Sequence, residues 1–146
     1  METHKRNWAL AIILGSTVLA MPALAVGEQK ITLKSEKAGQ EAKGQVIIAD
    51  VQAGQRGITV TTTGLKPNSV YTVWFVNMKP KMDMAGVGNG DYSFKTDAKG
   101  NATYNANISH AELEKWEMLE IAYHPDGNAK NMKNMQIALT GPVKMK

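Results

Sequence analysis

Two short segments of this sequence hold most of the side chains that could bind a soft metal. Seven of the nine methionines follow residue 25, and five of these lie in "NMKPKMDM" at 77–84 and "NMKNM" at 131–135. The second segment begins a few residues after His124. Thioether sulfur and imidazole nitrogen are soft or borderline ligands that suit Cu(I). One candidate copper site follows, with these ligands: Met82, Met84, His124, Met132 and Met135.

The same methionines have two other interpretations, which stay open. Methionine is a flexible filler of hydrophobic cores and a common component of adaptable contact surfaces. On this view Met78 continues a buried strand, and Met135 lies on the inner face of the last strand. Four lysines in or beside the two segments would repel a cation: Lys79, Lys81, Lys130 and Lys133. The alternatives to a copper site are therefore an apolar contact surface and loop packing without a ligand.

The sequence contains no recognisable catalytic set. The glycines of "AGVGNGD" at 85–91 are followed by Asp91 and a strand pattern, whereas a phosphate-binding loop needs Lys-Ser/Thr and a helix there. His110 and His124 are too few for a zinc cage. There is no cysteine, which excludes disulfides, thiolate metal sites and cysteine nucleophiles. We therefore expect a non-enzymatic protein.

The N-terminus has the pattern of a secretory signal peptide. Lys5 and Arg6 precede an apolar run at 9–20, and small residues at Ala23 and Ala25 follow. This order predicts a signal peptide over 1–25 and export to the periplasm or beyond. Its removal lowers the net charge from +4 to +3, with no basic run that would indicate a nucleic-acid partner. The sequence after residue 25 has no further apolar run, so no membrane span is expected in the mature chain.

The rest of the chain has the alternating pattern of short β-strands. We expect a polar segment with one short strand over 26–43 and a single β-domain over 44–146. "VYTVWFV" at 70–76 is apolar on both faces and predicts a central strand. "DYSFKTD" at 91–97 and "ATYNANI" at 102–108 predict a hairpin. The pattern indicates an all-β, antiparallel Greek-key β-sandwich of about seven strands with one short crossover helix.

That helix has clear start signals. Ser109 is a suitable N-cap, and Glu112 follows three residues later as in a capping box. Ile108 and Leu113 have the spacing of a hydrophobic staple. We expect the helix over 110–116.

Two resemblances to known families concern the fold. "GLKPNSVYTVWF", with Leu65, Pro67, Tyr71 and Val73, resembles the tyrosine corner of fibronectin type III and other immunoglobulin-like domains. In those domains the tyrosine hydroxyl bonds to the backbone a few residues upstream and fixes the entry to the next strand. This resemblance implies an immunoglobulin-like sandwich.

The second resemblance is to the layout of the copper,zinc superoxide dismutases. It loosely spans 58–139 and includes G-L-x-P, a glycine-rich loop, "TDAKGNA" and "IAYHPDGN". The family's pair of copper-binding histidines is replaced here by Val73 and Phe75. Only His124 stands at a position comparable to a family copper ligand. The resemblance therefore implies the fold and does not imply dismutase activity.

The sequence favours a small exported β-sandwich with a non-enzymatic binding or structural role, whose partner would be a protein or a small molecule. Its partner surface would combine 78–91 with 124–135, because both segments carry apolar residues in predicted loops. Copper binding through the methionines and His124 is the alternative, and a degenerate dismutase-like domain is the second alternative. No nucleic-acid partner is expected.

Overall fold

The protein is described by a computed structural model that covers residues 27–144 in detail. The expected signal peptide at 1–25 lies outside these residues. No helix within 27–144 has the length and apolar character needed to cross a membrane.

The described chain is an all-β, antiparallel structure, which confirms the expected fold class. It has nine strands where about seven were expected. Their bounds are β1 Gln29–Ser35, β2 Lys43–Gln52, β3 Gln55–Thr63, β4 Val70–Asn77, β5 Asp83–Gly86, β6 Ser93–Lys95, β7 Ala102–Ser109, β8 Met118–His124 and β9 Gln136–Pro142.

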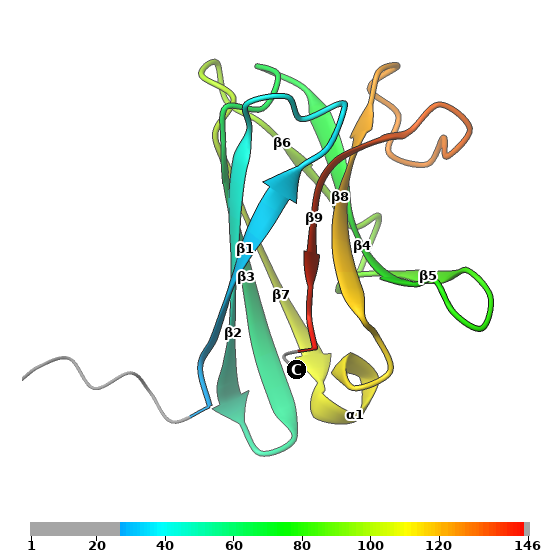
Figure 1. Cartoon of the computed structure of the whole chain (residues 1–146). Helices are drawn as coiled ribbons and strands as arrows, with labels where there is room; N and C mark the ends of the chain where they lie inside the picture. The colour runs from blue at the N-terminus through cyan, green and yellow to red at the C-terminus, as the bar shows by residue number, and fades with distance from the viewer. Residues whose placement is uncertain (1–26, 145–146) are drawn as a thin grey trace, which may run out of the picture.

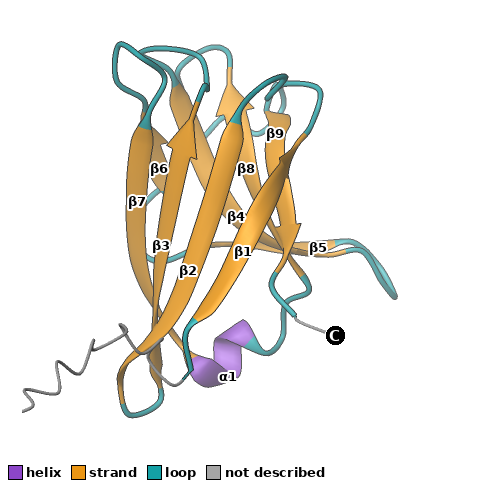
Figure 2. Cartoon of the chain, turned by 60° about the vertical axis from the view of Figure 1, so that its left-hand side comes forward, coloured by secondary structure: helices purple, strands orange, loops and turns teal. Residues whose placement is uncertain are grey.

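The strands form two layers that face each other across one core (Figure 1). Pairing runs in the order β5-β4-β8-β9-β1-β2-β3-β7, and β6 also pairs with β4. The first half of β1 pairs with β2, whereas Lys34 and Ser35 pair with β9. The short strand expected within 26–43 is therefore the one that joins the two layers. Figure 2 shows β1, β2, β3 and β7 in front of β8, β9 and β4.

The core lies between the inner faces of the layers. Val46, Ile48, Ile58 and Val60 supply one side, from β2 and β3. The other side comes from β4 and β8, through residues that are fully buried: Tyr71, Val73, Phe75, Leu119 and Ile121. Burial of this apolar area is the main term that stabilises a domain without disulfides.

The predicted tyrosine-corner hydrogen bond is present. The backbone N–H of Lys66 donates to the Tyr71 hydroxyl over 3.0 Å. The Tyr71 ring packs between Phe94 and Tyr123, with ring centroids 5.6 Å and 5.4 Å away. Tyr71 thus fixes the turn into β4, as the resemblance to immunoglobulin-like domains implied.

The predicted helix is shorter than expected. Helix α1 spans His110–Leu113, and the Ser109 hydroxyl accepts from the Glu112 N–H over 3.1 Å, as the capping pattern predicts. The Glu112 carboxylate does not return to Ser109. It binds Lys115 Nζ and Trp116 Nε1 instead, which holds the residues after the helix.

The hairpin expected from 91–97 and 102–108 does not form. β6 pairs with β4, whereas β7 pairs with β3 in the other layer. The turn at 97–101 therefore carries the chain from one layer to the other. Alternation of apolar residues predicts the two strands but not their partners.

The glycine-rich segment interrupts an edge strand. β5 and β6 both pair with β4, and Val73 links them: its carbonyl accepts from Val87 N–H, and its N–H donates to the Tyr92 carbonyl. Gly88 and Gly90, in the excursion between these bonds, have φ of 94° and 81°. Such φ values favour glycine, which explains the composition of the segment.

Candidate functional site

The outer face of β4 and β8 carries a second apolar cluster, separate from the core. Trp74, Val76 and Ala122 are its buried members. Five partly buried residues pack against those three: Met84, Tyr92, Met118, Met135 and Ile137. We name the surface formed by all eight residues the methionine face. One side of this layer is therefore apolar although it does not face the core.

Trp74 forms the floor of a hollow of about 690 Å³ on this face. One wall comes from the glycine-rich segment, through Gly90, Asp91 and Tyr92. The other wall comes from the segment between β8 and β9: Ala129, Lys130 and Met132. The two segments that were predicted to share one surface, 78–91 and 124–135, therefore both line this hollow over Trp74.

Tyr92 is held over the hollow in an unusual backbone conformation. Its φ is +58°, which is uncommon for a residue other than glycine. Its ring packs edge-on to Trp74, with centroids 5.6 Å apart. A Cβ on Gly86 would lie 2.0 Å from this ring, so only glycine at 86 leaves room for Tyr92.

A chain of buried hydrogen bonds runs beneath the hollow. Trp74 Nε1–H donates to Thr72 Oγ1 over 2.7 Å, and Thr72 Oγ1 lies 2.7 Å from His124 Nε2. His124 Nδ1 lies 3.2 Å from the Asn131 carbonyl, which only accepts, so Nδ1 carries a proton. In the neutral ring Nε2 then accepts from the Thr72 hydroxyl. The chain ties Trp74 to the segment that supplies Met132.

His124 is therefore placed for a structural role. It is 1% exposed, and both ring nitrogens are occupied by Thr72 and Asn131. A metal ion at either nitrogen would have to break one of these hydrogen bonds.

Two of the five candidate copper ligands, Met84 and Met135, lie far apart along the sheet. Met84 lies opposite Val76, which in turn lies opposite Met118 at the start of β8. Met135 precedes Gln136, which pairs with Tyr123 near the end of β8. Positions 118 and 123 are five residues apart, which corresponds to about 17 Å along a strand. One ion cannot contact both the Met84 and Met135 sulfur atoms over that separation.

The other methionine placements differ from expectation in two cases. Met78 is 54% exposed, so it does not continue the core of β4. Met135 packs on the methionine face and not inward, because the pairing of β8 with β9 shifts register between Ile121 and Ala122. Met82 and Met132 are exposed, at 62% and 42%.

The metal positions of the dismutase layout do not fit a metal here. Val73 and Phe75 are fully buried in the core. Among residues 27–144, no group of three or more His, Cys, Asp and Glu side chains is arranged to hold a metal ion. Of the dismutase-type ligands, only His124 has a counterpart in this part of the chain, and its ring is hydrogen-bonded to Thr72 and Asn131.

Sequence reasoning missed Trp74, Thr72 and Tyr92. The segment 70–76 is apolar on both faces, which predicts a strand buried on both sides but does not show which face is covered by a second layer. The polar Thr72, two residues before Trp74, was the available signal that this face differs from the one bearing Tyr71 and Val73.

A second hollow of about 920 Å³ opens elsewhere, between 36–41, 64–67 and the start of β9. Lys66 Nζ lies near it, 4.6 Å from the centroid of the Tyr123 ring.

Comparison with protein-family models, curated proteins and solved structures finds no match to this chain.

Proposed function

We propose that this protein is an exported, non-enzymatic binding protein whose partner is another protein. The observation that carries the proposal is the hollow over Trp74, which 90–92 and 129–132 line together. An aromatic floor with flexible side chains at its margin suits an anchor residue of a partner.

The exposed apolar residues support a protein partner. Four large hydrophobic side chains are exposed in the described chain, and three are methionines of the two segments: Met78, Met82 and Met132. Methionine adapts its shape to a contact surface because its side chain is unbranched and flexible. These residues would extend the contact beyond the hollow.

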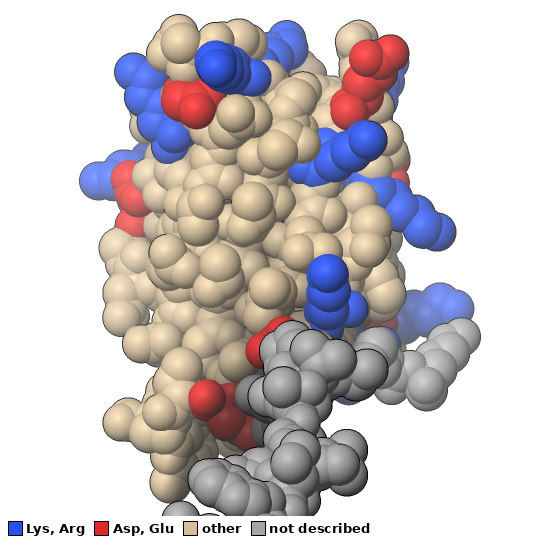
Figure 3. Space-filling view, turned by 90° about the vertical axis from the view of Figure 1, so that its left-hand side faces the viewer, with Lys and Arg blue, Asp and Glu red and all other residues tan. Residues whose placement is uncertain are grey.

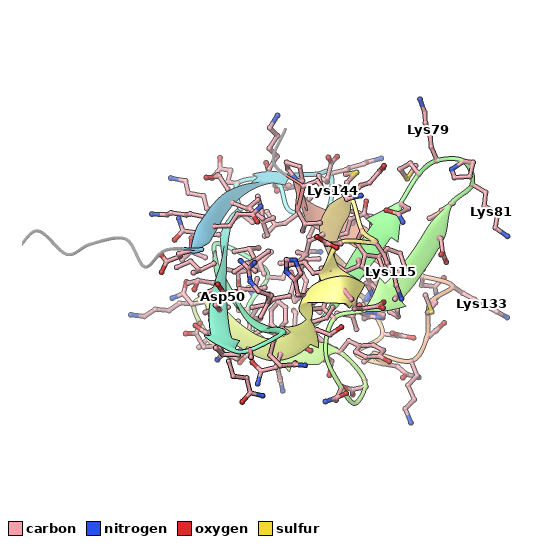
Figure 4. All side chains as sticks on the ribbon, turned by 90° about the horizontal axis from the view of Figure 1, so that it is seen from below. Asp50, Lys79, Lys81, Lys115, Lys133 and Lys144 are labelled. Carbon is pink, nitrogen blue, oxygen red and sulfur yellow. The ribbon has the colours of Figure 1, made fainter. Side chains whose placement is uncertain are left out.

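The charges beside these methionines favour an acidic partner. Lys79, Lys81 and Lys133 project from the same side of the molecule (Figure 4). Within residues 27–144, none of their ammonium groups has a carboxylate within 4.0 Å. Unpaired lysines around an apolar patch complement acidic groups on a partner.

The neighbouring carboxylates are already engaged within their own turns. Asp91 accepts from the Ser93 hydroxyl and N–H, and these bonds lower the pKa of Asp91. Asp126 accepts from the Asn128 N–H and the Asn131 amide, which likewise lowers its pKa. These two carboxylates already use oxygen atoms within their own turns, whereas Lys79, Lys81 and Lys133 have no carboxylate partner among residues 27–144.

An immunoglobulin-like relationship is part of this proposal. The Lys66–Tyr71 bond supports it, as do two antiparallel layers around one core. The replacement of the copper-binding pair by Val73 and Phe75 counts against a working dismutase.

Site-specific photocrosslinking tests the proposal. A photoreactive amino acid would replace Met82 or Met132, and the variant would be produced and crosslinked in the cells that naturally make the protein. We expect both positions to give one adduct of the same mass. Val51 is the matched control, because it is 55% exposed and lies on β2 in the other layer. The proposal is wrong if neither methionine position gives an adduct, or if position 51 gives the same one.

A further inference from the structure

The hairpin formed by β4 and β5 places Met78 opposite Met82 and Met84, two of the candidate copper ligands, across one turn. Its last pairs are Val76 with Met84 and Asn77 with Asp83. Strand side chains alternate between the two faces, so one residue further along, Met78 and Met82 fall on the face of Val76 and Met84. Figure 1 shows β5 and the turn before it projecting from the side of the molecule.

A fourth methionine lies on the other flank of Val76. Met118 pairs with Val76 across β4 and β8, and both Met84 and Met118 pack against the Val76 cluster. Met84 on β5 and Met118 on β8 therefore flank one small side chain on β4. Cross-strand partners have Cβ atoms about 5 Å apart, a gap that two flexible methionine side chains can close around one ion.

We propose that this hairpin binds one Cu(I) ion through the sulfur atoms of Met78, Met82 and Met84, with Met118 beside them. Thioethers are soft neutral ligands and select Cu(I) over Zn(II), Mg(II) or Ca(II). Met78 and Met82 are more than half exposed, so an ion reaches them without opening the fold. His124, Met132 and Met135 take no part.

The surrounding charges permit a cation on this face. Lys79 and Lys81 extend away from the hairpin in different directions (Figure 4). Glu120, two residues from Met118 on the same face of β8, brings a carboxylate toward the site.

Competition between the protein and a Cu(I) chelator, without oxygen, tests the site. We expect one Cu(I) per chain and no comparable binding of Zn(II). Replacing Met78 and Met82 together by leucine, which retains similar volume, should weaken Cu(I) binding by at least about 10-fold. Met132→Leu and Met135→Leu are matched controls and should leave the affinity unchanged. X-ray absorption of the copper complex should show sulfur ligands without imidazole nitrogen.

Three results would overturn the copper site: no binding at micromolar Cu(I), an unchanged affinity in the Met78/Met82 variant, or an equal loss in Met132→Leu. Urea unfolding of each variant separates loss of the ligand from loss of the fold. The copper site does not rest on partner binding. A photocrosslink from position 132 would stand if copper failed, and copper binding would stand if the crosslink failed.

Discussion

At the scale of single residues, Thr72 connects the floor of the hollow to the loop above it. Its hydroxyl accepts from Trp74 and faces His124, and all three side chains are at least 91% buried. Thr72→Val keeps the shape but leaves the indole N–H and the imidazole nitrogen without partners. Each orphaned group costs about 1–3 kcal/mol. The free energy of unfolding measured in urea should fall accordingly.

Thr62→Val provides the comparison for this change. Thr62 is also a buried threonine in a strand, but its hydroxyl makes one long bond of 3.4 Å to the Ala102 carbonyl. We expect a much smaller loss there. Equal losses in the two variants would mean that the Thr72 hydrogen bonds add nothing beyond the burial of a hydroxyl.

At the scale of elements, strand β8 carries an unfavourable charge on the methionine face. Burial, and secondarily the charge of Glu36, raises the pKa of Glu120 above 4.5. When folding raises the pKa of a carboxyl, its neutral form adds stability at pH values below the pKa of the unfolded chain. That stability is lost as the pH rises through the pKa of the folded state. Ionised Glu120 therefore destabilises the protein at pH 7.

Glu120→Gln should raise the free energy of unfolding at pH 7 and change it little near pH 4, as measured by urea unfolding at both pH values. Glu117→Gln, at an exposed position before β8, should have little effect at either pH. A Glu120→Gln gain of the same size at both pH values would show that ionisation is not the cause.

The sequence predicted those elements whose signals are local. Strand β4 was expected at 70–76 and spans Val70–Asn77, and the Ser109 cap begins α1 as expected. β5 and β6 were harder to recognise, because an excursion rich in glycine separates two short pieces of one edge.

Candidate site residues depend on which strands become neighbours, and a period of two residues does not specify this. The proximity of Met132 to Trp74 depends on β4 pairing with β8, and the outward position of Met135 depends on a register shift. The candidate copper ligands were grouped by their closeness in sequence, whereas the register of β4 with β5 and β8 places Met84 and Met118 beside Val76.

At the scale of the whole molecule, the two layers present different outer surfaces. The layer of β1, β2 and β3 is largely uncharged at its centre, with lysines and carboxylates toward its margins (Figure 3). Thr59 on β3 bonds to Asn105 on β7 there, over 3.0 Å. The opposite layer carries the methionine face and the unpaired lysines. A partner that contacts both the methionine face and these lysines would therefore bind only the layer that carries them.

This asymmetry predicts that position, and not net charge, governs partner binding. Reversal of Lys79, Lys81 and Lys133 to glutamate should strongly reduce the photocrosslink from position 82 and remove its dependence on salt, since charges near an interface steer association and are screened by ions. The same reversal of Lys30, Lys34 and Lys43, exposed on β1 and β2, changes the net charge equally. If this second variant loses the crosslink to the same extent, the partner responds to total charge, and the lysines beside the methionine face have no special role.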